Sequence, residues 1–213
     1  MRWVVGAALL GFASSALLSS IFHLPRDHFI ALHAIAVLVF LAAYARIEGI
    51  DPRVQFRRRW AGGLLAGVLV GALLARTVLR QPGSSRPAGA DLGWAILWDG
   101  ALYGVIDALL LSVLPVLAVY GTRPTGELRS SAARWRWGLT ALAASLCITA
   151  AYHAGFAEFR SPALLAPLVG NAIVTLSYLA TGSPIAAVLS HAVMHGAAVL
   201  HGTATTVQLP PHY

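Results

Sequence analysis

Seven apolar runs, each long enough to cross a bilayer, are the feature that most constrains this chain. A helix needs about 20 mainly apolar residues to cross the hydrocarbon core. Hydrophobic residues make up 58% of the 213 residues and charged residues only 11%, a balance that excludes disorder, a coiled coil and a water-soluble enzyme. The sequence therefore predicts an all-α, polytopic membrane helix bundle. Its runs lie at about 3–22, 28–47, 61–80, 93–120, 137–156, 163–180 and 184–202.

The connections between these runs are too short to hold a soluble domain. The two longest are 81–92 and 121–136, both with Pro and Gly. We therefore expect a single membrane domain over 1–213, and we interpret the first run as a retained span, because its apolar core is longer than that of a typical signal peptide. The single cysteine, Cys147, excludes a disulfide scaffold.

The basic residues are all arginine, and they sort by connection. Loops rich in Arg face the cytoplasm, so the arginine count predicts a cytoplasmic N-terminus and an outer C-terminus. The run Arg57 to Arg59 is then a topology signal that can also contact anionic lipid headgroups, and no nucleic-acid partner is expected. The ten arginines assigned to the inner side are Arg2, Arg46, Arg53, Arg57, Arg58, Arg59, Arg123, Arg129, Arg134 and Arg136. The lack of Lys suggests a high-GC bacterial genome and a plasma membrane location.

Three glycines recur every four residues in the third run, at Gly63, Gly67 and Gly71. Residues at this spacing share one helix face, and small residues there allow another helix to approach closely. The pattern predicts a helix-packing face and not a phosphate-binding loop.

Ionisable residues inside the apolar runs are costly to bury in lipid and are therefore candidate functional residues. Asp99 and Asp107 lie in the fourth run, His153 near the end of the fifth, and His191 and His195 in the seventh. By contrast, we expect the histidines around the first outer turn to be solvated near the membrane interface. These are His23, His28 and His33.

His191 and His195 are spaced i, i+4, so both rings lie on one face of a helix, one turn apart. Two imidazoles so placed can ligate one metal ion, although the same spacing also arises in interhelical hydrogen bonding. A buried carboxylate needs a partner. Asp99 or Asp107, together with His153 and the histidine pair, would make a ligand set for Zn²⁺ or a similar divalent metal.

The C-terminal half resembles the CPBP family, the CAAX-protease and bacteriocin-processing intramembrane metalloproteases. The stretch Leu168–His195 is similar to the family's last two core helices, with Thr181-Gly182-Ser183 leading into His191. His195 stands where the family usually has Asn. Upstream, His153 matches the histidine of the family's Phe-x3-His motif, with Thr149 in place of Phe.

The family's first motif, Glu-Glu-x3-Arg, is degenerate here. Asp99 stands for the first Glu, Gly100 and Gly104 replace the second Glu and the Arg, and Asp107 is a relocated carboxylate. The resemblance divides the chain into N-terminal helices (1–92) and CPBP-like core helices (93–202).

The resemblance implies an intramembrane endopeptidase that uses a metal-bound or polarised water on a peptide or membrane-protein substrate. His153, His191 and His195 would hold the metal, and Asp107 or Asp99 would be a further ligand or the general base. Asn171 in the sixth run is a candidate oxyanion or supporting donor, or an interhelical hydrogen-bond partner.

Three alternatives stay open. A non-catalytic protein on the same fold would explain the degenerate first motif. Seven spans ending in His-x3-His also resemble the PAQR and alkaline ceramidase hydrolases, in which Ser19 to His23 would match Ser-x3-His, although Asp27 then falls in a turn. A carrier or electron-transfer protein would use His153 with His191 or His195 as a proton relay or as haem ligands. The sequence does not set the oligomeric state.

Overall fold

The computed structural model describes residues 1–122, 130–204 and 208–210, and within these ranges all regular structure is helical. Among the described residues, seven segments are long and apolar enough to cross a membrane, which confirms the predicted helix bundle and indicates a multi-pass membrane protein. These spans are Arg2–Ile21, Arg26–Ile47, Trp60–Val78, Gly89–Gly121, Ser131–Gly155, Pro162–Thr181 and Pro184–His201.

Several spans are built from more than one helical element, because π-helical segments interrupt the first and fourth. In chain order the elements are α1 (Arg2–Ser14), the π-helical η1 (Ser15–Ile21), α2 (Arg26–Ile47), α3 (Pro52–Arg57), α4 (Trp60–Val78), α5 (Gly89–Ala95), the π-helical η2 (Ile96–Leu102), α6 (Tyr103–Ala108), the π-helical η3 (Leu109–Val113), α7 (Leu114–Gly121), α8 (Ser131–Gly155), the 3₁₀ turns η5 (Ala157–Phe159) and η6 (Pro162–Leu164), α9 (Leu165–Thr181) and α10 (Pro184–His201).

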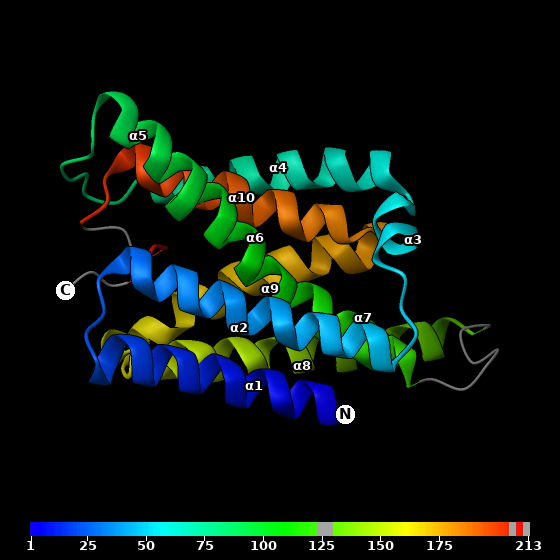
Figure 1. Cartoon of the computed structure of the whole chain (residues 1–213). Helices are drawn as coiled ribbons and strands as arrows, with labels where there is room; N and C mark the ends of the chain where they lie inside the picture. The colour runs from blue at the N-terminus through cyan, green and yellow to red at the C-terminus, as the bar shows by residue number, and fades with distance from the viewer. Residues whose placement is uncertain (123–129, 205–207, 211–213) are drawn as a thin grey trace.

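The fourth span is the centre of the bundle. It runs for 33 residues, and 78% of its most apolar window is buried. In Figure 1 it crosses the molecule diagonally as α5, α6 and α7, with α1 and α2 on one side and α4 and α10 on the other. At about 1.5 Å per residue it is longer than the roughly 30 Å hydrocarbon core, so its tilt matches the length of its sequence.

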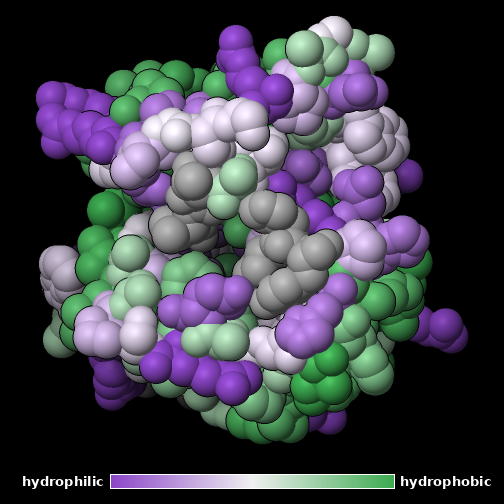
Figure 2. Space-filling model, turned by 90° about the vertical axis from the view of Figure 1, so that its left-hand side faces the viewer, coloured by the Kyte–Doolittle hydropathy of each residue, from purple (hydrophilic) through white to green (hydrophobic). Residues whose placement is uncertain are grey.

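The first span begins and α10 ends at opposite ends of the bundle (Figure 1), as expected for the odd number of spans in the described residues. The N-terminus shares its end with α3 and its exposed arginines, which belong to the predicted inner side. Two further arginines of that set, Arg123 and Arg129, lie outside the described residues. Figure 2 views the opposite end, where hydrophilic side chains spread over the face and apolar ones gather along its edges.

The first two spans are tied together at the N-terminal end of the molecule. Glu48, which follows α2, accepts hydrogen bonds at 2.8 Å from Arg2 and at 2.6 Å from the Trp3 indole. These hydrogen bonds lower the pKa of the Glu48 carboxyl, the bond from Arg2 contributing most.

The glycine face of α4 packs directly on α10, as the sequence predicts. A methyl group added at Gly67 would lie 2.8 Å from the side chain of Leu189, and one at Gly71 would lie 2.8 Å from that of Val193. Both distances are shorter than van der Waals contact. Only hydrogen at these positions lets α10, which carries His191, approach α4 so closely.

The fourth span approaches the other side of α10 through two more glycines. A Cβ atom at Gly100 would lie 3.0 Å from the Cα atom of Gly196, and one at Gly104 would lie 3.0 Å from backbone atoms of His191 and Ala192. The residues that stand where the resembled family has Glu and Arg are therefore close-packing positions in this chain. They bring the backbones of α6 and α10 together beside Asp107.

Candidate metal centre

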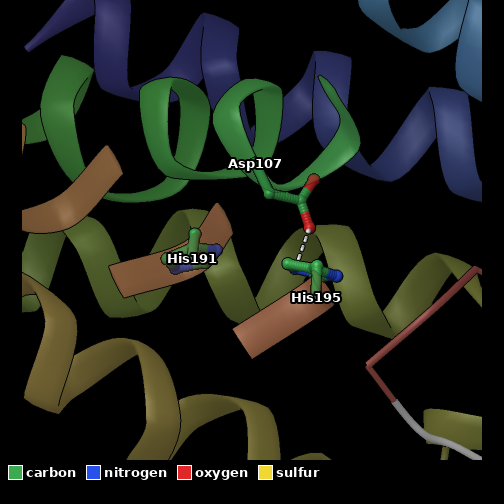
Figure 3. A group of neighbouring side chains, drawn as sticks. All are labelled: Asp107, His191 and His195. Carbon is green, nitrogen blue, oxygen red and sulfur yellow. Dashed lines mark ion pairs between the residues drawn. The ribbon is translucent and has the colours of Figure 1, made fainter. Parts of the chain in front are cut away.

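Three buried side chains meet between α6 and α10. Asp107, His191 and His195 are 3%, 4% and 2% exposed, and each offers one ligand atom such that these atoms all lie within 4.8 Å of one another. Figure 3 shows Asp107 pointing from α6 toward His195, with both histidines on α10. The distance from His195 Nε2 to Asp107 Oδ2 is 3.8 Å. This group could hold a metal ion.

The polar atoms of this group have few partners of their own. Neither ring nitrogen of His191 or of His195 has a hydrogen-bond partner in the described chain, nor does Asp107 Oδ1. Buried polar atoms without a partner are rare in folded proteins, because each costs free energy unless something binds it. A cation held by nitrogen and carboxylate oxygen atoms would satisfy several of them at once.

A cavity of about 480 Å³ adjoins these residues. Five of the six residues singled out from the sequence line it, namely Asp107, His153, Asn171, His191 and His195. Most of its remaining lining is apolar, including Phe156, Leu165, Val169, Ile173 and Met194. The volume is in the range of sites that bind small molecules or short chain segments.

His153 reaches the same cavity from α8 but lies outside the group of three ligand atoms. Its Nδ1 atom is 2.9 Å from the carbonyl oxygen of Thr149. Since a carbonyl only accepts hydrogen bonds, Nδ1 carries the proton and the Nε2 lone pair is left for a ligand. Histidines that bind metals are commonly oriented in this way.

Asn171 lines the cavity, but its amide is engaged in a hydrogen-bond network between helices. Its Oδ1 atom accepts a bond from Ser112 at 2.8 Å, and its Nδ2 atom donates to Ser145 at 2.8 Å and to Thr149 at 2.6 Å. The network joins the fourth span to α8 and α9. The structure thus shows the interhelical role that the sequence left open for this residue.

Asp99 lies away from the histidines and does not line the cavity as the structure describes it. It is buried, and its Oδ2 atom is 4.0 Å from an Arg26 nitrogen. Arg26 also donates hydrogen bonds to the carbonyl oxygens of Thr203 and Pro210. Of the two aspartates in the fourth span, the structure brings only Asp107 to the histidine pair.

The expectation that His33 is solvated is wrong. The residue is fully buried, with Nε2 3.7 Å from Asp107 Oδ1, whereas His23 and His28 are exposed. The signal for this was present in the sequence. Phe29, His33 and Val37 are spaced i, i+4, i+8, so the histidine lies on a stripe of α2 that is otherwise apolar and faces the bundle.

Comparisons with known proteins add no relative. No protein-family model, no curated protein and no solved structure matches this chain.

Proposed function

We propose that this protein is a CPBP-like integral membrane metallohydrolase, most simply an endopeptidase that cleaves a peptide bond in or near the membrane of a bacterium. The observation that carries the proposal is the convergence of Asp107, His191 and His195 beside a cavity, with ring nitrogens that have no protein partner in the described chain. The order of sequence motifs that resembles the CPBP family supports the reaction type.

The donor atoms fit Zn²⁺, which takes imidazole nitrogen and carboxylate oxygen in tetrahedral sites and keeps a position open for catalysis. His191 and His195 would supply two ligands from one helix. Asp107 or His153 would complete the set, since the Thr149 carbonyl holds the His153 ring with its Nε2 lone pair free. When bound, zinc would lower the pKa of a water molecule toward about 7 and polarise a carbonyl group.

The other residues around the site have separate proposed roles in proton transfer, substrate binding and helix packing. Asp107 is the only carboxylate among the described residues that line the cavity, so its oxygen is the candidate to accept a proton from the attacking water. The apolar lining, including Phe156 and Met194, would hold an apolar segment of substrate and limit the access of bulk water. Asn171 holds α8 and α9 against the fourth span.

A second candidate is a hydrolase of the PAQR and alkaline ceramidase kind, acting on an amide bond of a membrane lipid. The apolar cavity favours it, because an acyl chain would fill the space between Leu165, Val169 and Ile173. The same site would then cleave a lipid amide in place of a peptide bond.

The first experiment is metal analysis of protein purified in mild detergent without chelator. We expect about one equivalent of Zn²⁺ in the wild type and none in the triple variant His153→Ala, His191→Ala, His195→Ala, with helical content retained. His28→Ala, which alters an exposed histidine, is the matched control. A folded wild type that has been offered zinc and retains none would refute the metallohydrolase.

A hydrolysis assay then separates the candidates. A metal-loaded wild type is offered a fluorogenic membrane peptide and a fluorescent ceramide, with Asp107→Asn as the base-deficient variant. Peptide cleavage that falls about 10²–10⁴-fold in the variant supports the endopeptidase. Ceramide cleavage alone supports the lipid hydrolase, and a metal-loaded protein inactive on both points to the non-catalytic alternative.

A further inference from the structure

A chain of polar atoms runs from the first two spans to the buried carboxylate of α6. The Ser14 hydroxyl oxygen at the end of α1 is 3.0 Å from Nδ1 of His33 on α2. On the other edge of the same ring, Nε2 is 3.7 Å from Asp107 Oδ1. All three residues are buried, so this chain of contacts links three helices without solvent exposure.

The chemistry of the three groups decides which ring nitrogen of His33 carries the proton. An ionised carboxylate only accepts hydrogen bonds, so the proton of His33 belongs on Nε2, facing Asp107. Nδ1 is then an acceptor for the Ser14 hydroxyl, whose single proton is shared between Nδ1 and the carbonyl oxygen of Gly11, each 3.0 Å from the hydroxyl oxygen. The 3.7 Å contact is about 0.5 Å longer than the upper limit of a direct hydrogen bond, so His33 and Asp107 are in ion-pair range.

The His33 ring itself is held rigidly. It stacks on Phe29 with ring centroids 5.6 Å apart and planes 13° apart, and on Tyr152 with centroids 5.2 Å apart and planes 21° apart. A ring packed against two aromatic neighbours has little freedom to turn, so its Nε2 edge stays directed at Asp107. This makes His33 suited to fixing the orientation of the carboxylate.

The two oxygens of Asp107 face different histidines. Oδ1 is the nearer oxygen to His33 and Oδ2 to His195, at 3.7 and 3.8 Å. His33 belongs neither to the group of ligand atoms within 4.8 Å nor to the described lining of the cavity. Its place is therefore behind the carboxylate, on the side away from the candidate metal.

We infer that His33, oriented by Ser14, is a positioning residue that holds Asp107 with Oδ2 directed at the histidine pair of α10. The inference rests on the proposed metal centre, which it extends to the first two spans. Carboxylates that bind metals are themselves hydrogen-bonded, and loss of such a partner typically weakens metal affinity by 10- to 100-fold. The first two spans thus contribute to the site although none of their residues is in the described lining of the cavity.

The test compares three substitutions on α2. His33→Phe keeps an aromatic ring between Phe29 and Tyr152 but removes both nitrogens, while His33→Gln keeps an N–H donor near the position of Nε2. His28→Phe makes the same change at an exposed histidine of the same helix. The measurements are the Zn²⁺ dissociation constant, from competition with a chromogenic chelator in detergent, and the visible absorption spectrum of the Co²⁺-substituted protein.

We expect His33→Phe to bind Zn²⁺ about 10- to 100-fold more weakly and to shift the Co²⁺ spectrum. His33→Gln should recover most of the affinity, and His28→Phe should match the wild type. Ser14→Ala should weaken binding in the same direction and by less, and it decides the question if His33→Phe does not fold.

Two results would overturn the positioning role while leaving the metal centre intact. One is a Zn²⁺ affinity and a Co²⁺ spectrum equal to those of the wild type in folded His33→Phe. If His33→Phe does not fold, the same result in Ser14→Ala would overturn the role. The other is complete loss of metal in His33→Gln, as in the triple histidine variant, because that would make His33 a ligand. A wild type that binds no metal would overturn the centre and this role together.

Discussion

Replacing Asn171 by leucine tests whether this residue holds helices together or acts on substrate. Leucine has a similar volume, so the change removes hydrogen bonds without opening a large cavity. The three short bonds that are lost join Asn171 to Ser112, Ser145 and Thr149, at 2.6 to 2.8 Å, and a longer one to the Leu111 carbonyl, at 3.5 Å, is lost with them. Interhelical hydrogen bonds in membrane proteins average about 0.6 kcal/mol each, so three give a destabilisation of about 2 kcal/mol.

The assay is unfolding in mixed micelles with increasing sodium dodecyl sulfate, followed by circular dichroism, with metal content measured in parallel. Ser177→Ala is the matched control, because Ser177 is buried on the same helix and its hydroxyl donates only within that helix, to the carbonyl of Val174. We expect Asn171→Leu to lower the free energy of unfolding by about 2 kcal/mol and to retain metal, and Ser177→Ala to change little. Equal stability of the two variants, with hydrolysis lost only in Asn171→Leu, would refute the structural role.

Three further predictions follow from the packing, the lipid-facing surface and the end of the second span. Gly67→Leu should cost about 1–3 kcal/mol by overpacking α4 against α10 and lower metal content, whereas Gly62→Leu, where an added Cβ meets nothing within 4 Å, should do neither. Because maleimides react with the thiolate, which an apolar environment disfavours, Cys147, exposed on a membrane-spanning helix, should resist a maleimide in intact membranes and react once the protein is unfolded in sodium dodecyl sulfate; labelling by an impermeant maleimide in intact membranes would contradict its lipid exposure. Because the hydrogen bond from Arg2 lowers the pKa of Glu48, this contact should stabilise the protein at neutral pH and be lost as the pH falls through that lowered pKa, so the unfolding of wild type and Glu48→Gln should converge in acid.

The seven spans could be predicted because lipid leaves the backbone few choices. A segment in the hydrocarbon core must satisfy its own hydrogen bonds, and a run of about 20 apolar residues does so as a helix. The pairing of His191 with His195 followed from helical spacing alone. The glycine face of α4 could be predicted for the same reason, because Gly63, Gly67 and Gly71 are spaced by nearly one helical turn.

The choice between Asp99 and Asp107 could not be made from spacing. Eight residues apart on a regular α-helix, they would point about 80° apart. In the structure, Asp99 lies within a π-helical segment, and another follows shortly after Asp107. Each π turn holds more residues than an α turn and changes the direction of the residues that follow. No pattern that we recognise in the sequence predicts where such a turn will form.

The contact between His33 and Asp107 could not be predicted from the sequence either, but the cause is different. The helical stripe of α2 shows that His33 faces inward, yet not which helix it meets. That partner depends on the diagonal course of the fourth span (Figure 1), which is a property of the whole bundle. Side chains from distant spans meet there because the tilted fourth span packs against α2 through η2 and α6.

The glycines on both sides of α10 repeat every four residues, and so do its two histidines. Sliding this helix by one turn, about 5.4 Å, would therefore preserve much of the backbone fit while moving His195 to the place of His191. The register is fixed at the helix ends, where Ser183 fills the space beside Gly63, and Ser84 fills the space beside Gly202, whose φ of +147° suits glycine alone. Contacts remote from the site thus help to set how many histidines reach it, and a single turn inserted or deleted at either end of α10 would change the ligand set without altering any ligand.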